Sequence, residues 1–208
     1  MLELTQSAII LYGAQSHTGI DILLRSQLEA FVDLANLVRE PEYIGVMHAE
    51  YHREWLKLAK GGVDTENPYL AYFRNNPNAL AKLQQHEVAL HVISAKTPPK
   101  SKLEKFQSAG MEHEYRSIYN SLCNDSHNNL RALTSRHFRR KTDHEIEIVV
   151  FEEPNDEDII VSLDTLILFM MRGYEVVTGY EGFKTDRNPR FDELVAARDR
   201  LLMELSQQ

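Results

Sequence analysis

The segment from His17 to Glu40 (HTGIDILLRSQLEAFVDLANLVRE) constrains the fold of this chain more than any other stretch. Its apolar residues recur with the period of a helix, and together they cover most of the helix circumference. These residues are Ile20, Leu23, Leu24, Leu28, Phe31, Leu34, Ala35 and Val38. Because a helix that is apolar nearly all round needs neighbours on several sides, we expect a central helix inside a helical bundle.

Further helical patterns flank this segment. A short helix is expected over residues 4–13, and another begins at Pro41 and ends at the glycine pair Gly61-Gly62. Residues 129–138 either continue a helix that begins near Glu112 or restart it after a kink. The remaining helical patterns lie at about residues 76–97, 101–110, 162–178 and 189–206. Helices therefore account for most of the chain.

One stretch departs from this pattern. The residues from His144 to Pro154 (HEIEIVVFEEP) alternate and are rich in β-branched side chains, which predicts a strand. Two continuations stay open: Asp156 to Leu163 pairs with this strand in a hairpin, or Ser162 caps the helix that follows. The expected fold class is mainly α, a multi-helix orthogonal or up-down bundle with one small β element near residues 144–151.

The length of 208 residues is typical of one domain. We expect a single domain over residues 1–208, with a helical core at about 15–140. The β element and two helices follow it at about 142–206.

Cysteine usage and hydropathy limit the environment of the chain. The only cysteine is Cys123, which excludes a disulfide framework and cysteine-based zinc sites and predicts a reducing, cytoplasmic location. The most apolar run, Ile159 to Met171, contains Asp164 and is too short to span a bilayer, so no membrane association is expected. The net charge of −8 means that contact with a nucleic acid would need a local basic patch.

Arg25 and Glu29 are the first candidate site residues. They lie four residues apart on the most apolar helix of the chain, so their side chains share one face. Since neither residue type is buried without a partner, we expect an ion pair or a polar pocket. The pair either lines a functional site or holds the helix packing together.

His127 is the second candidate. On a continuous helix from Glu112, it would follow Tyr119 and Cys123 along one side. Neutral imidazole both donates and accepts protons near neutral pH, so His127 can act as a general acid or base. The alternative is a structural histidine that either caps the helix or is buried.

A basic cluster is the third candidate. Within eleven residues the chain carries five fixed positive charges and a histidine: Arg131, Arg136, His137, Arg139, Arg140 and Lys141. Such a cluster can bind the phosphates of RNA. Equally, it can be a solvated helix end, because cations favour the C-terminus of a helix.

Two other patterns point to ordinary packing. His48 and His52 have the i, i+4 spacing that lets two histidines bind one metal ion, but the intervening order is not His-Glu-x-x-His and no third ligand is evident. We therefore predict no metal and no cofactor. The sole tryptophan, Trp55, has the spacing of a core residue together with Tyr51 and Leu58.

Two quoted segments resemble a widespread bacterial family of uncharacterised helical proteins. They are LLRSQLEAFVDLANLVREPEY and KLEKFQSAGMEHEYRSIYNSLCNDSHNN, and the resemblance covers roughly residues 15–140. The first carries Leu-x-Arg-Ser-x-x-Glu and the second Tyr-x-x-x-Tyr-x-x-x-Ser-x-x-x-His. The matching residues are Arg25, Ser26, Glu29, Tyr115, Tyr119 and His127, while Cys123 stands where a serine is usual.

This family is distantly similar to the HEPN superfamily of helical domains, many of which cleave RNA in toxin or defence systems. Those enzymes use an Arg-x(4–6)-His motif in a dimer cleft, and Arg131 and His137 have that spacing, although Ala132 stands where a polar residue is typical. The resemblance implies a metal-independent ribonuclease of a defence or toxin module. Its implied partners are RNA and a second copy of the chain.

Two hypotheses of function follow. In the first, His127 or His137 is the acid or base of a HEPN-like ribonuclease, and an arginine stabilises the charged phosphate. In the second, the chain is a non-enzymatic interaction or regulatory protein. Arg25, Glu29 and His127 then form a structural polar cluster, and the strand at Ile146 to Val150 pairs with a partner protein.

Overall fold

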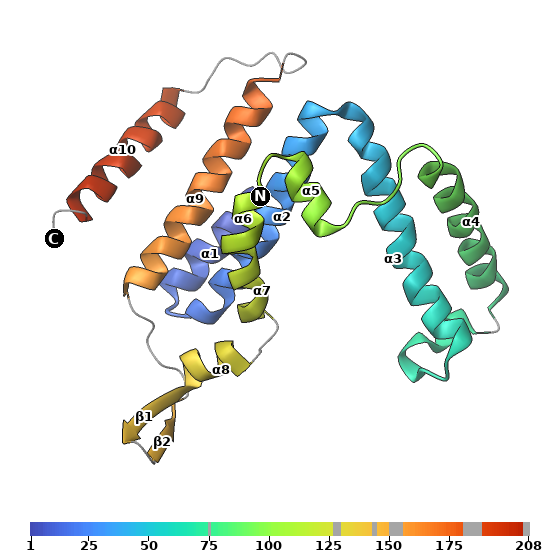
Figure 1. Cartoon of the computed structure of the whole chain (residues 1–208), viewed down its shortest axis with the longest axis horizontal. Coiled ribbons are helices and arrows are strands. Elements are labelled where there is room, and N and C mark those ends of the chain that lie inside the picture. The colour runs from blue at the N-terminus through green and yellow to red at the C-terminus, as the bar shows by residue number, and fades with distance from the viewer. Residues whose placement is uncertain (75, 127–129, 143–144, 150–155, 181–188, 206–208) are drawn as a thin grey trace. The chain divides into compact units, whose positions relative to one another are not determined.

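The computed structural model describes residues 1–208 except 75, 127–129, 143–144, 150–155, 181–188 and 206–208. Most of the described chain is helical, and two short strands form the one β element of that part (Figure 1). The expected fold class is therefore confirmed. In chain order the elements are α1 (Leu2–Gly13), η1 (His17–Gly19), α2 (Ile20–Arg39), η2 (Pro41–Tyr43), α3 (Ile44–Asp64), η3 (Pro68–Phe73), α4 (Pro77–Ser94), α5 (Lys102–Ser108), α6 (Glu112–Glu114), η4 (Tyr115–Tyr119), α7 (Asn120–Ser126), α8 (Leu130–His137), β1 (Phe138–Thr142), β2 (Glu145–Ile148), α9 (Asp156–Thr178) and α10 (Pro189–Leu205).

The chain divides into two compact units. The first, here called the outer unit, contains residues 1–35 and 116–208, and the second, the middle unit, contains residues 36–115. The expected single domain stays a prediction, and each unit is described below by itself.

In the outer unit, α2 packs among α1 and α9. Phe31 on α2 contacts Phe169 on α9, with ring centroids 5.3 Å apart. The fully buried Gln27 donates from Nε2 to the carbonyl oxygen of Leu166 at 2.6 Å and accepts a hydrogen bond from the Thr5 hydroxyl at 3.0 Å. A buried amide with both ends satisfied costs little, so Gln27 joins three helices without a polar penalty.

The C-terminal helix α10 lies alongside α9 (Figure 1). Arg198 donates two hydrogen bonds to Asp164, at 2.6 and 2.8 Å. The rings of Tyr174 and Phe191 stack with their centroids 4.5 Å apart. The start of α9 corrects one expectation: it begins at Asp156, so Ser162 lies inside the helix and does not cap it. Its hydroxyl instead donates to Asp21 on α2 at 3.0 Å.

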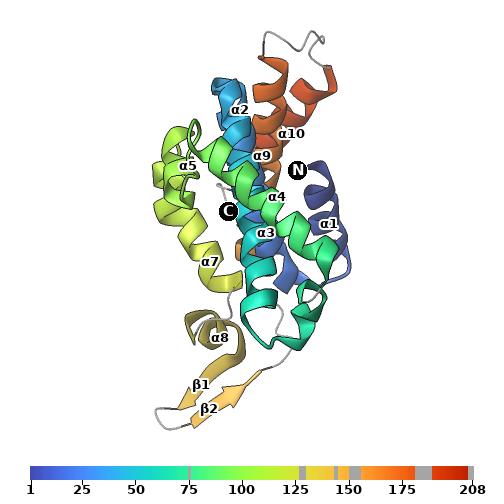
Figure 2. The same cartoon turned by 90° about the vertical axis from the view of Figure 1, so that its right-hand side faces the viewer.

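In the middle unit, α4 runs along α3, as both views show (Figures 1 and 2). The expectation that Gly61-Gly62 ends α3 is wrong, because the helix continues to Asp64. A side chain at Gly62 would meet the carbonyl oxygen of Leu70 at 2.6 Å. The glycine at position 62 therefore allows η3 to approach the helix backbone closely.

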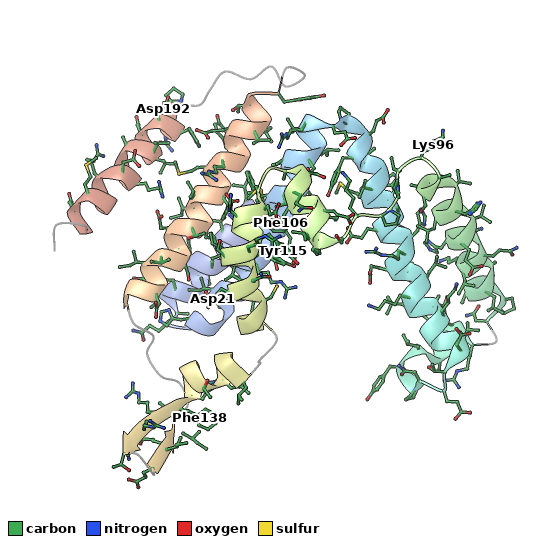
Figure 3. All side chains as sticks on the ribbon, in the orientation of Figure 1. Asp21, Lys96, Phe106, Tyr115, Phe138 and Asp192 are labelled. Atoms are coloured by element: carbon green, nitrogen blue, oxygen red, sulfur yellow. The ribbon has the colours of Figure 1, made fainter. Side chains whose placement is uncertain are left out.

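The short helices α5 and α6 complete the middle unit. A capping box of Ser101 and Glu104 begins α5, as the sequence S-x-x-E favours. Gly110 has a φ of +73°, a conformation that suits glycine, and it follows the end of this helix. The rings of Phe106 and Tyr115 then meet edge to face at 5.3 Å (Figure 3).

The β element differs from both sequence-based expectations. The strand near residue 145 pairs with Phe138–Thr142, which lies before it in the chain, and not with residues 156–163. The helix expected over residues 129–138 ends at His137, and β1 begins at Phe138. The register places Arg139 opposite Glu147, so the strand gains a cross-strand pair of opposite charge.

None of the described helices is both long enough and apolar enough to cross a lipid bilayer.

Candidate functional site

Two distant parts of the sequence meet in the outer unit at Arg25, Glu29 and Tyr119. Arg25 and Glu29 lie one turn apart on α2, and Tyr119 ends the segment η4, 90 residues after Glu29. We call these three residues the RET cluster. They come from the two segments on which the family resemblance rests.

The contacts of the RET cluster centre on one carboxylate oxygen. Arg25 Nε lies 3.3 Å from Glu29 Oε1, and the Tyr119 hydroxyl donates to the same oxygen at 2.9 Å. The Arg25 guanidinium also lies over the Tyr119 ring, 5.5 Å from its centroid. The expected ion pair of Arg25 and Glu29 is thus confirmed, and a hydrogen-bonded phenol holds it in place.

Exposure separates the members of this cluster. The side chains of Arg25 and Glu29 are 23% and 26% exposed, whereas Tyr119 is 4% exposed. The Tyr119 side chain is therefore the buried part of the cluster, and the charged groups of Arg25 and Glu29 stay accessible to solvent. A fixed cation beside a carboxylate, open on one side, is an arrangement that can bind a polar or anionic ligand.

The electrostatics keep Tyr119 and Arg25 each in one protonation state. Burial, and then the charge of Glu29, raise the pKa of Tyr119 well above its ordinary value. Burial works against the charge of Arg25, but hydrogen bonding to Tyr119 and attraction to neighbouring groups outweigh it, so the pKa of Arg25 is raised. Tyr119 is therefore a hydrogen-bond donor and not a base, and Arg25 is a permanent cation.

The backbone around Tyr119 is unusual. Tyr115–Tyr119 forms a π-helical turn between α6 and α7. Such turns insert one extra residue per turn and are frequent at functional sites, because they turn a side chain away from its regular helical position. Cys123 follows one turn later, and its partial burial beside Arg25 and Tyr119 places a thiol next to this cluster.

The comparison with protein families matches residues 1–146. The chain belongs to DUF5677, a family of unknown function. The match contains all three residues of the RET cluster and ends within β2. No curated protein and no solved structure matches the chain significantly. Membership in this family confirms the expected relation to uncharacterised helical proteins.

The remaining predicted catalytic residues have different outcomes. His127 lies outside the described residues. His137 ends α8, and its Nδ1 donates to the carbonyl oxygen of Val149 at 3.1 Å while its own carbonyl oxygen accepts from the Val149 amide at 2.9 Å. His137 therefore fastens the base of the hairpin. Its catalytic role stays a prediction.

The structure divides the basic cluster between the helix α8 and the strand β1. Arg139, Arg140 and Lys141 lie on β1 and are exposed, whereas the side chains of Arg131 and Arg136 on α8 lie outside the described part. Lys141 Nζ lies 3.3 Å from Glu147. Between Phe138 and Ile148 the sequence carries three cations and three carboxylates, so the hairpin has no net charge. RNA binding by these five cations stays a prediction.

The structure also bears on the histidine spacing and the tryptophan position of α3. Across the described residues, no group of three or more histidine, cysteine or acidic side chains is placed to hold a metal ion. The prediction that Trp55, Tyr51 and Leu58 belong to the core is wrong, because these side chains are 40%, 55% and 49% exposed. Trp55 instead stacks on His86 of α4, a contact that the sequence spacing within one helix does not indicate.

Sequence reasoning missed Tyr119 as a site residue, although the family resemblance includes it. The available signal was its spacing, since Tyr119 precedes Cys123 and His127 at intervals of four. A buried tyrosine looks like a core residue until its hydroxyl has a partner. Only the contact between η4 and α2 gives it that partner.

Proposed function

We propose that the chain is a metal-independent ribonuclease, distantly HEPN-like, and that it acts at the RET cluster in a bacterial defence or toxin module. The observation that carries the proposal is the convergence of Arg25, Glu29 and Tyr119 from the two distant segments, with both charged groups open to solvent. A purely structural ion pair gains nothing from this exposure, because solvent weakens it.

The reaction uses the RNA itself as nucleophile. The 2′-oxygen attacks the adjacent phosphorus, the bond from phosphorus to O5′ breaks, and the products are a 2′,3′-cyclic phosphate and a 5′-hydroxyl. His127 takes the proton of the 2′-hydroxyl, and the departing O5′ takes a proton from water. A general base at this step contributes roughly 10²- to 10⁴-fold in rate.

The described residues supply binding and charge. Arg25 contacts the phosphate and stabilises the negative charge that grows on its oxygens in the transition state. Glu29 accepts hydrogen bonds from both Arg25 and Tyr119, so it orients the guanidinium. Because Arg25 keeps its charge and Tyr119 keeps its proton near neutral pH, neither of them makes cleavage depend on pH there.

The test is cleavage of a labelled single-stranded RNA by the full chain in the presence of a chelator. We expect products that end in a cyclic phosphate, and no cleavage where a 2′-deoxynucleotide replaces the nucleotide at the cut. Arg25→Ala and His127→Ala should each lower the rate by about 100-fold or more. Arg172→Ala, an exposed arginine on α9 of the same unit, is the matched control and should leave the rate unchanged.

Two results would refute the ribonuclease. One is intact RNA after incubation with folded wild-type protein at high concentration. The other is full activity of both Arg25→Ala and His127→Ala. His137→Ala separates the two candidate histidines, since loss of activity in this variant alone, with the hairpin intact, would place the chemistry at His137.

One observation favours a second function, a non-enzymatic interaction protein. Every residue of β1 and β2 is exposed, and the strand register places Phe138, Ile146 and Ile148 on one face of the hairpin. A two-stranded hairpin has open edges on both sides, to which an extended segment of a partner protein can add as a third strand. Its balanced charge fits a protein partner better than a polyanion.

Stability distinguishes the two functions. If the cluster is only structural, Glu29→Gln and His127→Ala lower the melting temperature and abolish no activity. A variant that keeps the stability of the wild type but loses RNA cleavage contradicts the interaction protein.

A further inference from the structure

A pair of histidines joins α3 and α4 in the middle unit. His52 Nδ1 on α3 lies 2.8 Å from His86 Nδ1 on α4, and the two ring centroids are 5.0 Å apart. Two aromatic residues of α3 frame the pair. The ring centroid of Tyr51 lies 5.3 Å from that of His52 and 5.8 Å from that of His86. The Trp55 ring stacks on His86, with centroids 5.7 Å apart and an interplanar angle of 12°.

The distance between the two nitrogens determines how many protons they hold. A separation of 2.8 Å is that of a hydrogen bond, so one ring donates its N–H and the other accepts with a lone pair. The two Nδ1 atoms therefore share a single proton. When both rings become imidazolium ions, both nitrogens carry hydrogen, and two N–H groups and two positive charges face each other.

The surroundings do not compensate for a second charge. The pKa of His52 is lowered by burial first and then by the charges of His86 and His48. His48 and Tyr51 face His52 from α3, and His86 faces it from α4. The segment η3, which packs against both helices, contains no charged residue. Among the described groups that shift the pKa of His52, none is a carboxylate.

We propose that the His52–His86 contact is an acid-opened latch that holds α4 against α3. At neutral pH the shared proton makes a hydrogen bond between the helices. In mild acid the second proton turns this bond into a repulsion, and α4 loosens. The ion pair of Lys60 and Glu87, with Nζ 2.9 Å from Oε1, bridges the same two helices.

The direction of the pH effect follows from the lowered pKa of His52. In the unfolded chain His52 binds its proton near the ordinary value of about 6.5. The folded form binds it only at lower pH, so the latch contributes its full stability above about pH 6.5. This stability is lost as the pH falls below 6.5 and passes through the folded pKa. The proposal concerns the middle unit and does not depend on the ribonuclease.

The first experiment measures the melting temperature of the full chain between pH 7.5 and 5, with a chelator present. We expect the wild type to lose about 3 °C more over this range than the double variant His52→Gln/His86→Gln, whose amides can still hydrogen-bond and do not titrate. His91→Gln is the matched control, since His91 is an exposed histidine of α4 outside the pair. It should keep the pH dependence of the wild type.

The second experiment needs no variant to fold. NMR titration of the histidine rings of the wild type should show His52 taking up its second ring proton below the ordinary value of about 6.5, with the resonances of His86 changing in the same step. Trp55, the only tryptophan, reports the same event, because an imidazolium ion in contact with indole quenches its fluorescence. Titration of His52 at the ordinary value of about 6.5 without any response at His86, or an equal pH dependence of wild type and double variant, would overturn the latch.

Discussion

Two ion-paired clusters of this protein use the same chemistry in different environments. In the RET cluster of the outer unit, the cation Arg25 is 23% exposed and meets a carboxylate one turn away on its own helix. In the middle unit, the cation Lys105 on α5 is 3% exposed and meets Glu50, 55 residues away on α3. Asn36 donates to the carbonyl oxygen of Lys105 at 2.9 Å and fixes the backbone of α5.

The difference in exposure leads to different expectations for the two ion pairs. A buried ammonium ion has lost its water, so its carboxylate partner is required for folding. A cation with a quarter of its surface in solvent keeps much of its hydration, and its ion pair adds little stability. What remains at Arg25 is a fixed charge that a ligand can reach. The comparison therefore predicts that changes at Glu50 affect folding, whereas changes at Glu29 affect activity.

The largest effect is expected from Glu50→Ala. It leaves the ammonium group of Lys105 buried without its carboxylate, and we expect a loss of about 3 kcal/mol in the free energy of unfolding. Urea denaturation at pH 7 measures it. Lys105→Met is the matched control. It removes the buried charge and leaves the partly exposed Glu50 in contact with solvent, so it should cost much less. Equal losses in both variants would show that the charge is not the cause.

A smaller effect on stability is expected from Glu29→Gln, at about 1 kcal/mol, because its partner Arg25 remains partly hydrated. The RNA cleavage rate should fall at the same time, since the guanidinium loses its orienting carboxylate. Melting curves and cleavage assays on one preparation test both parts. The comparison breaks if Glu29→Gln unfolds the protein as strongly as Glu50→Ala does.

Tyr119→Phe sharpens the role of the phenol. It keeps the buried ring and removes the hydroxyl that donates to Glu29, so we expect a loss of about 1 kcal/mol. The pKa of Tyr119 is raised, so the contribution is complete below the unfolded pKa of about 10 and disappears only in strong alkali. The difference from wild type should therefore be constant from pH 6 to 9. A difference that varies over this range would assign the titration to another group.

The smallest effect is expected at the hairpin. Ile146→Thr changes an exposed strand residue, and we expect a change within about 0.5 kcal/mol. Thermal melts measure it. A larger loss would mean that the exposed face of the hairpin is covered in solution, and the loss should then depend on protein concentration.

Periodicity predicted most of the helices, because an apolar stripe of the right period has to find a core. The helices at the two ends, α1 and α10, were found in this way, as was the ion pair of Arg25 and Glu29, whose spacing alone brings the groups together. Local patterns were less reliable where an element ends. Gly61-Gly62 was read as a helix end. In the structure α3 continues past it, and the absence of a side chain at Gly62 lets η3 pack close to the helix.

The strand β1 was missed for a related reason. Its sequence, FRRKT, has the charge of a helix C-terminus and little β propensity. Only the pairing with β2, which sets Glu147 opposite Arg139, makes the extended conformation favourable. The same pairing brings Lys141 within 3.3 Å of Glu147, so part of the positive charge of β1 meets a carboxylate.

By itself, the sequence determined the helical class, the burial of apolar residues along α2 and the pairing of Arg25 with Glu29, because each depends on residues close together in the chain. The tertiary structure alone decided that Tyr119 meets Glu29, that Lys105 is buried on Glu50 and that His52 lies against His86. These contacts join residues 34 to 90 positions apart. Such contacts depend on how whole helices pack, and no local spacing encodes that packing.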